Sequence, residues 1–207
     1  MAIRILRTQD APVQSWRNGG GQTRELLTWK PADRGDWHVR ISVATVERDG
    51  PFSSLPGVQR WLALLDGGGA CLRWADRQCT IAPGDLPLHF EGEPAPYCRL
   101  LGQPTRDLNL MTRAGSALMT LVRPGTPFRQ QHAQCGLYVP VAGTMWDGAL
   151  GVRIELPAHT LLWDDAPGRS AYWRFEASGV AAPATIGFWL GFTPANRGGD
   201  LTPAVPA

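Results

Sequence analysis

Residues 36–49 read DWHVRISVATVERD and form the longest stretch of the chain that contains neither glycine nor proline. Side chains alternate along it: one face takes Trp37, Val39, Ile41 and Val43, and the other takes His38, Arg40, Ser42 and Ala44. A period of two indicates a β-strand, because successive side chains of a strand point to opposite faces. The stretch therefore predicts a strand with one apolar and one largely polar face.

Short runs of the same kind recur along the chain, and each is closed by glycine, proline or aspartate. They cover residues 22–29, 58–66, 71–81, 107–113, 137–142, 150–156, 160–164, 171–176 and 185–192. The chain has 24 glycines and 18 prolines in 207 residues, so it must turn often. Many short strands without a long helix predict an all-β sandwich or barrel.

Two segments of the chain can be laid over each other, which suggests an internal duplication. Residues 61–94 align with residues 137–167 with a gap of three residues. The run IAPGD at 81–85, followed by an apolar strand, has the rhythm of a cupin, a small jelly-roll barrel. We therefore predict an all-β bicupin, with two cupin-like jelly-roll β-barrels packed together.

The expected boundaries follow from this duplication. Residues 1–113 would form the first cupin-like barrel, which carries the ligand pocket. Residues 114–196 would form the second barrel, mainly structural and entered through a linker near residues 114–130. Residues 197–207, rich in glycine, proline and alanine, would be a loosely ordered tail.

Charge and hydropathy exclude several classes of partner. The formal net charge is +2 and the basic residues are scattered, so we expect no nucleic acid and no membrane as a partner. The N-terminus has no apolar core of signal-peptide length, and no segment approaches the ~18 apolar residues needed to span a bilayer. These features predict a cytoplasmic protein.

The residues that could bind a metal are dispersed. Many cupins hold a divalent ion with an H-x-H pair, a glutamate and a later histidine. Here no histidine lies within four residues of another, and the four cysteines show no metal-ligand spacing; these residues are His38, His89, His132, His159, Cys71, Cys79, Cys98 and Cys135. We therefore expect no metal and no other cofactor, and we expect the cysteines in the core.

Several predicted strands carry a face that is polar at one end and apolar at the other. Thr23 and Glu25 precede Leu27 and Trp29, Arg40 and Ser42 precede Ala44 and Val46, and Arg60 precedes Leu62 and Leu64. Residues 107–113 place Asp107, Asn109, Met111 and Arg113 on a single face. Such faces predict a barrel with an apolar floor and a polar mouth; the alternative is an amphipathic sheet whose charges point to solvent.

The stretch WRNGGGQTRE at residues 16–25 has two compatible explanations. Asn-Gly favours a tight turn, and glycine enters positive φ at little cost. Glycine also lets backbone N–H groups approach a bound anion, beside Asn18, Thr23 and Glu25. The excess of arginine at the predicted mouth favours a carboxylate, which a guanidinium binds with two hydrogen bonds. The candidate ligand-binding residues are Asn18, Gly20, Thr23, Glu25, Arg40, Ser42, Arg60, Asp107, Asn109, Met111 and Arg113.

Four motifs also carry a resemblance. WRNGGGQTRE, WHVRISVA, GPFSSLPGVQR and DLNLMTR occur in this order between residues 16 and 113. In this respect residues 14–113 resemble the HutD/Ves family, whose members are bicupins. The resemblance implies a link to bacterial histidine utilisation, with a regulatory or metabolite-binding role and N-formylglutamate as a proposed ligand. No secure enzymatic activity is attached to the family.

These observations favour a metal-free bicupin that binds a small carboxylate metabolite and acts as a sensor or accessory protein in amino-acid catabolism. The main alternative is an isomerase or hydrolase that uses Glu25 or Asp107 as general base. A third hypothesis is a protein-interaction module built on some of the nine tryptophans. The sequence leaves a homodimer open.

Overall fold

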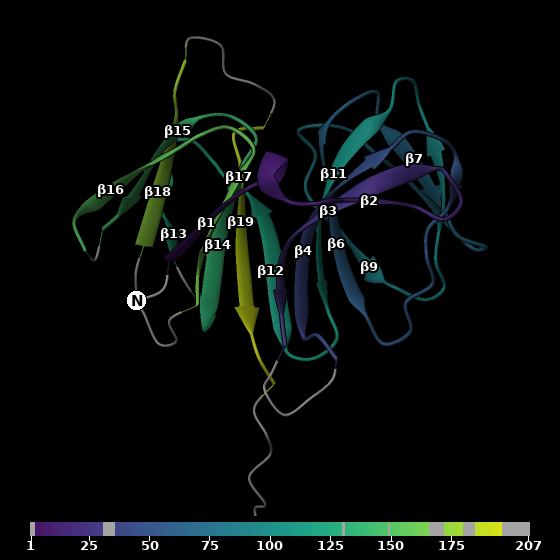
Figure 1. The fold of residues 1–207 in the computed structure, drawn as a ribbon, viewed down its shortest axis with the longest axis horizontal. Helices are drawn as coiled ribbons and strands as arrows, with labels where there is room; N and C mark the ends of the chain where they lie inside the picture. The colour runs from purple at the N-terminus through teal and green to yellow at the C-terminus, as the bar shows by residue number, and fades with distance from the viewer. Residues whose placement is uncertain are drawn as a thin grey trace, which may run out of the picture.

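The computed structural model describes residues 3–30, 36–129, 131–148, 150–165, 172–179 and 185–195. They form nineteen antiparallel strands and one short 3-10 helix, η1 (Thr8–Asp10), arranged as two β-sandwiches side by side (Figure 1). The all-β prediction is confirmed. The described residues contain no helix that is long and apolar enough to cross a membrane. The expected tail at 197–207 lies outside the described residues.

The first sandwich consists of a six-stranded and a four-stranded sheet. The six-stranded sheet has the order β2 (Val13–Ser15), β3 (Gly21–Trp29), β4 (Val39–Val46), β11 (Thr105–Thr112), β6 (Gln59–Asp66) and β9 (Leu88–Glu91). The four-stranded sheet has the order β5 (Gly50–Pro51), β10 (Tyr97–Leu100), β7 (Ala70–Arg73) and β8 (Gln78–Ile81).

The second sandwich consists of a five-stranded and a four-stranded sheet. The five-stranded sheet has the order β1 (Ile3–Arg7), β17 (Thr160–Asp164), β14 (Gln134–Val139), β19 (Phe188–Thr193) and β12 (Ser116–Leu121). The four-stranded sheet has the order β13 (Phe128–Arg129), β18 (Tyr172–Ala177), β15 (Gly143–Asp147) and β16 (Val152–Leu156).

The duplication seen in the sequence recurs in the strand order. The series β4-β11-β6-β9 in the first large sheet corresponds to β12-β19-β14-β17 in the second. The small sheets correspond in the same way, β5-β10-β7-β8 to β13-β18-β15-β16. Eight successive strands, β4 to β11, thus repeat as β12 to β19, and each copy carries the strand order of the other.

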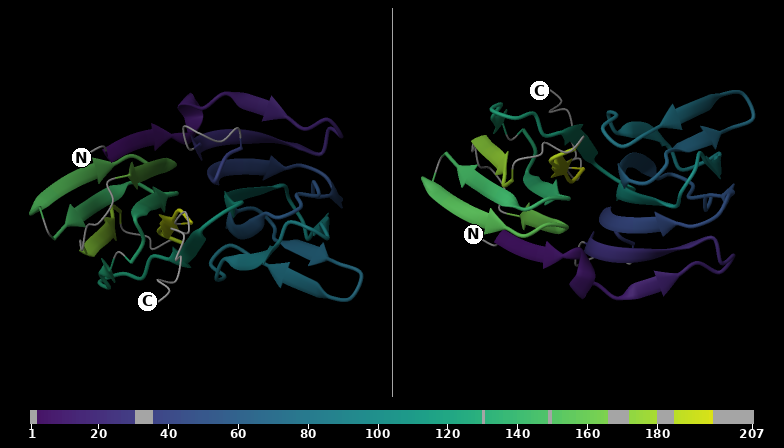
Figure 2. Two further views of the ribbon diagram at one scale, coloured as in Figure 1. Left: turned by 90° about the horizontal axis from the view of Figure 1, so that it is seen from below. Right: turned by 90° about the horizontal axis from the view of Figure 1, so that it is seen from above.

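One segment lies in a different sandwich than chain order suggested, and another is a strand where a linker was expected. β1 pairs along its whole length with β17, so the first strand belongs to the large sheet of the second sandwich (Figure 2). β12 falls inside the expected linker but pairs with β19. Local alternation cannot reveal either pairing, because it shows that a segment is extended and not which strand it joins.

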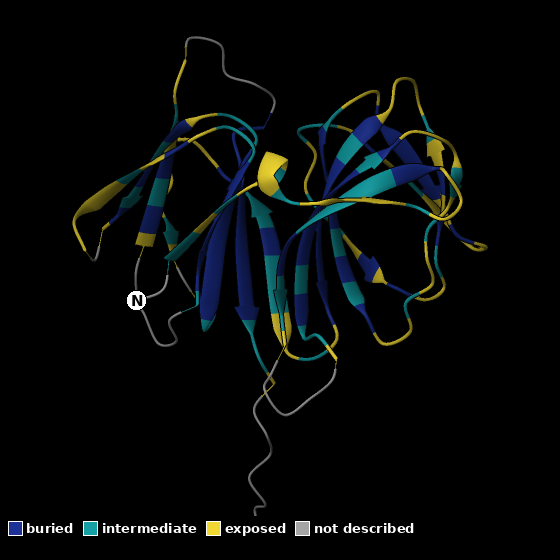
Figure 3. Cartoon of the chain, viewed as in Figure 1, coloured by how far each residue is buried: buried dark blue, intermediate teal, exposed yellow. Residues whose placement is uncertain are grey.

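An apolar layer between the two large sheets joins the sandwiches. β4 and β11 contribute Val39, Ile41, Val43, Leu108 and Leu110 to it. The second sandwich contributes residues of β14, β17 and β19, namely Tyr138, Leu161, Trp163, Phe188, Leu190 and Phe192. Figure 3 shows these central strands as buried. The predicted apolar face of residues 39–43 is thereby confirmed.

Each sandwich also has a core of its own. In the first, Val46, Leu62, Leu64, Leu72 and Phe90 pack together between its two sheets. In the second, the core includes Leu137, Met145, Leu162, Trp173 and Trp189. The cysteines at 71, 98 and 135 are buried, as expected for core residues, whereas Cys79 is only partly buried and packs against the first core.

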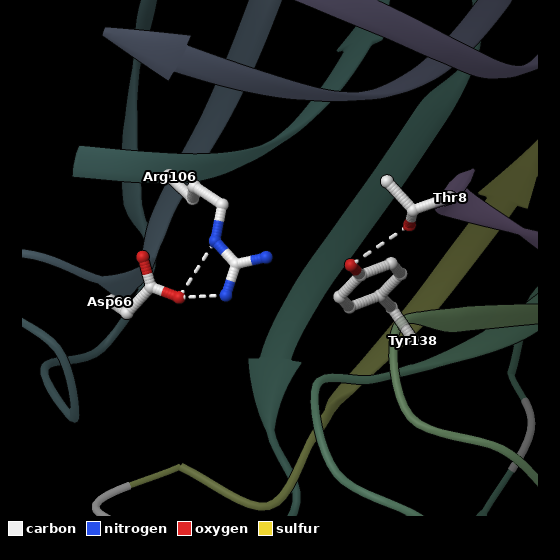
Figure 4. A network of polar contacts seen from close by, with 4 residues as sticks. All are labelled: Thr8, Asp66, Arg106 and Tyr138. Atoms are coloured by element: carbon white, nitrogen blue, oxygen red, sulfur yellow. Dashed lines mark hydrogen bonds and ion pairs between the residues drawn. The ribbon is translucent and has the colours of Figure 1, made fainter. Parts of the chain in front are cut away.

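Polar contacts border the apolar layer between the sandwiches. In the first unit, Arg106 Nε and Nη2 donate hydrogen bonds to Asp66 Oδ2, with a distance of 2.7 Å for Nε. Nearby, the hydroxyls of Thr8 and Tyr138 lie 3.1 Å apart and connect the segment after β1 with β14 (Figure 4). Arg106 and Asp66 are about half exposed, so their ion pair adds little stability compared with the apolar layer beside it.

Truncating a side chain in the layer between the sandwiches tests its contribution. Leu110 is fully buried in this layer, so Leu110→Ala should lower the free energy of unfolding by about 2–5 kcal/mol through lost contacts and a residual cavity. Leu86→Ala is the matched control because Leu86 is 63% exposed, and it should change stability by about 0.5 kcal/mol or less. Denaturant titration measures both, and equal effects would contradict the role given to this layer.

Candidate functional site

A cavity of about 570 Å³ opens in the first sandwich. β4, β6 and β11 line it with the side chains that alternate with those of the layer between the sandwiches. The turn before β3 and the segment after β5 complete the wall. Its size lies within the range usual for sites that bind small molecules.

Strand register orders the polar side chains of the cavity into rows. Arg40 of β4 and Arg60 of β6 both lie opposite Met111 of the central strand β11. Since neighbouring strands are about 4.8 Å apart, the Cα atoms of the two arginines are separated by roughly 9–10 Å. Two residues further along the strands, the next row contains Ser42 and Asn109.

The row that contains Asp107 lies further along the same strands. Ala44 and Leu64 are its cross-strand neighbours, and neither has a polar side chain. Arginines therefore lie at one end of the lining of β11 and a carboxyl group at the other, about 13 Å away along the backbone at ~3.3 Å per residue.

Arg60 is a buried cation that forms no ion pair with a carboxylate among the described residues. Its side chain is 6% exposed, and its Nη2 donates a 3.2 Å hydrogen bond to Asn109 Oδ1. The guanidinium lies 4.9 Å from the ring centre of Phe52 and 5.2 Å from that of Phe90, so part of its charge faces aromatic rings. Burial, together with nearby Arg40, lowers the pKa of Arg60 to about 10, so it stays charged near neutral pH.

Arg40 occupies the other end of the same row. Its Nη2 donates a hydrogen bond to Met111 Sδ at 3.1 Å, and its guanidinium lies 5.1 Å from the centre of the Trp37 ring. Burial lowers the pKa of Arg40, and Glu25 opposes that effect. Among the described residues, neither Arg40 nor Arg60 forms an ion pair, and the Nε atoms of both have no hydrogen-bond partner.

Asp107 is a nearly fully buried carboxyl group. It is 2% exposed, and its Oδ1 atom has no hydrogen-bond partner among the described residues. Burial raises the pKa of Asp107 to about 7, while Thr105 and Arg60 act in the opposite direction. Near neutral pH the group therefore exists in both protonation states.

The structure brings together most of the side chains predicted to form the site. Eight of the eleven candidates line the cavity: Asn18, Thr23, Arg40, Ser42, Arg60, Asp107, Asn109 and Met111. The other three, Gly20, Glu25 and Arg113, do not. Whether the eight bind a ligand remains a prediction.

Each of the three residues outside the lining has a local cause for its position. Gly20 lies in the turn, where its N–H donates to Asn18 Oδ1 at 3.0 Å, so this amide already has an acceptor. Glu25 lies at a β-bulge opposite Ser42 and approaches Arg40 without reaching the lining. Arg113 follows the last residue of β11 and lies against Trp37, because the strand ends at Thr112.

The bulge in β3 also corrects the predicted pattern of that strand. Glu25 pairs with Ser42 but Leu27 pairs with Ile41, so Leu26 is an extra residue in β3. Leu27 and Trp29 therefore face the layer between the sandwiches and not the cavity. Since an extra residue reverses the facing of everything after it, strict alternation misplaced this half of the strand.

The glycine-rich turn has a clear structural role. Gly19 has a φ of +66°, which favours glycine, and a Cβ on Gly21 would lie 2.2 Å from the carbonyl oxygen of Thr45. The turn places Asn18 at the cavity, and Trp16 Nε1 donates a 2.8 Å hydrogen bond to Thr23 Oγ1. The predicted tight turn is therefore present, and a side chain at position 21 would push the start of β3 away from β4.

Seven described residues of the lining were not predicted: Ser15, Trp16, Arg17, Pro51, Phe52, Ser53 and Leu55. Ala44, which also lines the cavity, was expected on the apolar part of the β4 face. Trp16 and Arg17 could have been found, because they directly precede Asn18 in the turn already singled out. Phe52 and Ser53 lie after the two-residue strand β5, where no periodicity marks the facing of a side chain. Tertiary contact alone, such as that of Phe52 with Arg60, identifies them.

The described residues contain no group of three or more histidine, cysteine, aspartate or glutamate side chains placed to hold a metal ion. His89 lies away from the cavity lining, stacked on Trp61 with ring centres 4.2 Å apart, and its Nε2 is 2.8 Å from Gln59 Oε1. Among the described residues, Asp107 is the only acidic side chain that lines the cavity.

Comparison with known proteins identifies the family. The family model HutD matches residues 8–178, which is most of the chain. The chain belongs to the HutD family. Protein Ves of Escherichia fergusonii is 30% identical over 184 residues, covering 88% of this chain and 93% of its own. The resemblance drawn from the sequence is thereby confirmed.

Solved structures agree on the fold. A Pseudomonas aeruginosa PAO1 protein described as conserved and of unknown function, PA5104, is 26% identical with a TM-score of 0.81, covering 93% of this chain and all of its own. HutD from Pseudomonas fluorescens SBW25 is 22% identical with a TM-score of 0.79, covering 94% and 100%. A single-residue variant of oxalate decarboxylase from Bacillus subtilis is 8% identical with a TM-score of 0.54, covering 92% and 77%. These cupin-fold structures confirm the bicupin prediction.

The pKa of Asp107 predicts how stability depends on pH. Between about pH 4 and pH 7 the unfolded chain releases the proton that folded Asp107 retains, so the free energy of unfolding should fall as pH rises and level off above pH 7. One pKa unit corresponds to about 1.4 kcal/mol, so the total is on the order of a few kcal/mol.

Asp107→Asn should remove this decline and make the ligand-free protein more stable than the wild type at pH 8. Denaturant titration at pH 5 and pH 8 gives the comparison. Asp76→Asn, which changes an exposed carboxylate in the turn between β7 and β8, is the control and should leave the wild-type decline in place. Equal pH dependence of Asp107→Asn and the wild type would show that burial does not perturb Asp107.

Proposed function

We propose that the cavity binds a small carboxylate metabolite without a metal or other cofactor, and that the protein has a regulatory or accessory role in histidine or amino-acid catabolism. The observation that carries the proposal is the pair Arg40 and Arg60, which line the cavity and form no ion pair among the described residues. A buried cation without a counterion is costly, and a carboxylate guest would offset that cost.

The chemistry of the lining favours a carboxylate over other anions or neutral guests. Guanidinium groups match the two oxygens of a carboxylate, and Arg60 has donors left after its bond to Asn109. Ser42 and Asn109 can add hydrogen bonds in the next row. Two arginines on either side of Met111 also suit a dicarboxylate, with one acid group for each cation.

Family membership supplies the biological context of the proposal. A role linked to histidine utilisation follows from the relation to HutD. N-formylglutamate, the ligand that the family resemblance suggested, has two carboxylates and therefore fits the chemistry of the two arginines. We take it as the first acid to test.

Catalysis is a second candidate function, and Asp107 is the observation that favours it. A carboxyl group with a pKa of about 7 in a cavity can act as general acid or base near neutral pH. Glu25, the other candidate base, does not line the cavity. Turnover of a bound acid would distinguish an enzyme from a binding protein.

The protein-interaction hypothesis loses its main support. All nine tryptophans lie within the described residues, and none is exposed. A docking patch built on tryptophan would need several of these rings at the surface.

Ligand binding should raise the melting temperature of the protein. At a hundredfold excess over Kd, a ligand that binds only the folded state adds about 2.7 kcal/mol. For a chain of this size that corresponds to a rise of roughly 5–11 °C. Arg60→Ala should remove most of the rise measured with N-formylglutamate or glutarate, since a charge-assisted hydrogen bond contributes about 1.5–3 kcal/mol. Arg60→Lys should restore a part of it, because ammonium is a point charge.

Arg99→Ala provides the matched control, because Arg99 is an exposed arginine on β10 outside the cavity lining. It should respond to each acid as the wild type does. Absence of a shift in the wild type with either acid at millimolar concentration, or equal responses of Arg60→Ala, Arg40→Ala and the wild type, would refute the carboxylate proposal.

The dispersed histidines and cysteines predict that binding needs no metal. Elemental analysis of purified protein should find no stoichiometric iron, zinc, manganese or nickel, and the thermal shift should survive dialysis against a chelator. About one equivalent of a transition metal per chain, lost in His38→Ala or His89→Ala, would overturn this part of the proposal.

A further inference from the structure

Asp107 is an acid in a site proposed to bind acids, and this conflict points to a coupling between ligand and proton. We infer that Asp107 is a neutral carboxylic acid in the complex and donates an O–H hydrogen bond to an oxygen of the bound carboxylate ligand, so that binding takes up a proton wherever Asp107 is ionised in the free protein. The inference rests on the proposed function and specifies the chemistry of its site. No covalent bond forms, and the proton comes from the buffer.

Apart from Thr105, whose hydroxyl favours the ionised form, the position of Asp107 gives its carboxyl group few partners other than a ligand. It is 2% exposed, lines the cavity, and has an Oδ1 atom without a hydrogen-bond partner among the described residues. Its cross-strand neighbours Ala44 and Leu64 have no polar side-chain atom. A molecule that fills the cavity therefore brings the polar atoms that this buried oxygen lacks.

The charged and titratable groups around Asp107 can be named for each element packed against it. β6 contributes Arg60, which favours the ionised form, and Asp66, which opposes it. β10 contributes Cys98, whose pKa burial raises to about 12, so the thiol is neutral. β4 contributes Arg40, which acts mainly on Arg60, and β3 contributes Glu25 beside Arg40.

Within this set the ionised carboxylate is only marginally tolerated before any ligand arrives, as its pKa of about 7 shows. Placing a second carboxylate in the same low-dielectric cavity adds a like charge, which raises the pKa of Asp107 further. Two carboxyl groups that share a site hold one proton between them, and an O–H···O⁻ hydrogen bond is among the stronger kinds. The protonated acid therefore fits the complex better than the ionised one does.

Binding should consequently weaken as pH rises. If Asp107 remains protonated in the complex, linkage to a pKa of about 7 increases Kd about 25-fold between pH 6.5 and pH 8.5. Ordinary carboxylate ligands stay fully ionised over this range, so the change reports on the protein. A ligand that instead presented an N–H donor to ionised Asp107 would show the opposite trend.

Isothermal titration calorimetry with N-formylglutamate and with glutarate tests the inference on the full chain. Titrations at pH 8.0 in phosphate and in Tris, which differ in ionisation enthalpy, give the number of protons exchanged; we expect an uptake of about 0.9 per ligand by linkage. Asp107→Asn keeps the shape and an N–H donor but cannot titrate. It should bind nearly as tightly as the wild type does at pH 6.5, with little pH dependence, while Asp76→Asn keeps the wild-type pH dependence.

The outcomes separate this inference from the proposed function. If the wild type binds neither acid, the proposed function fails and takes the inference with it. If the wild type binds and Arg60→Ala does not, but proton exchange is zero or is a release, the carboxylate site stands and the inference is wrong. An Asp107→Asn variant that folds but retains the wild-type pH dependence would also overturn it.

Discussion

The apolar layer between the two large sheets is the contact on which the site depends. It anchors β4 and β11 from behind through Val39, Ile41, Leu108 and Leu110, all fully buried. The alternate residues of the same two strands, among them Arg40, Asn109 and Asp107, line the cavity. Because side chains alternate strictly along an unbulged strand, fixing one face fixes the other. The second sandwich thus supports a site to which none of its described residues contributes lining.

This arrangement explains why the cavity tolerates polar groups that oppose folding. Arg60 and Asp107 are each more than nine-tenths buried and incompletely hydrogen-bonded, which is destabilising. Burial of large side chains such as Trp163 and Phe188 in the layer behind them acts in the opposite direction, at about 25 cal/mol per Å² of apolar surface. Unfavourable buried polar groups persist where the surrounding structure holds them in place, and in proteins they are concentrated at sites that bind or react.

The sequence was informative where alternation is regular and long. The facing of β4 and of β11 up to Met111 could be predicted, and so could the burial of Leu62 and Leu64 inside the first sandwich, because nothing interrupts the period of two. Neither leucine lines the cavity, so they do not form its predicted floor. Alternation failed after Glu25, where one extra residue reverses the strand. It also could not assign β1 to a sheet in the other sandwich or place Phe52 beneath Arg60, since both depend on contacts between segments distant in sequence.

The duplication shows what distinguishes the copy that contains a cavity from the copy whose interior is filled. In the first copy, Met111 of β11 pairs with Arg60 of β6. The corresponding strands of the second copy are β19 and β14, where Trp189 pairs with Leu137. Phe128 of β13 stacks on Trp189 with ring centres 5.0 Å apart, and Trp173 lies 6.4 Å from the same ring. In the first copy the residue just after β5, Phe52, instead lies against the Arg60 guanidinium.

The two copies therefore share one strand order but differ in the side chains that occupy the space between their sheets. Large aromatic rings fill the space between the sheets of the second copy and contribute to its core. Long cations and a carboxyl group fill the same space poorly in the first copy, because each needs more polar partners than the described residues of neighbouring strands supply. The cavity is the consequence of that mismatch. This difference supports the proposal that ligand binding belongs to the first sandwich and that the second is mainly structural.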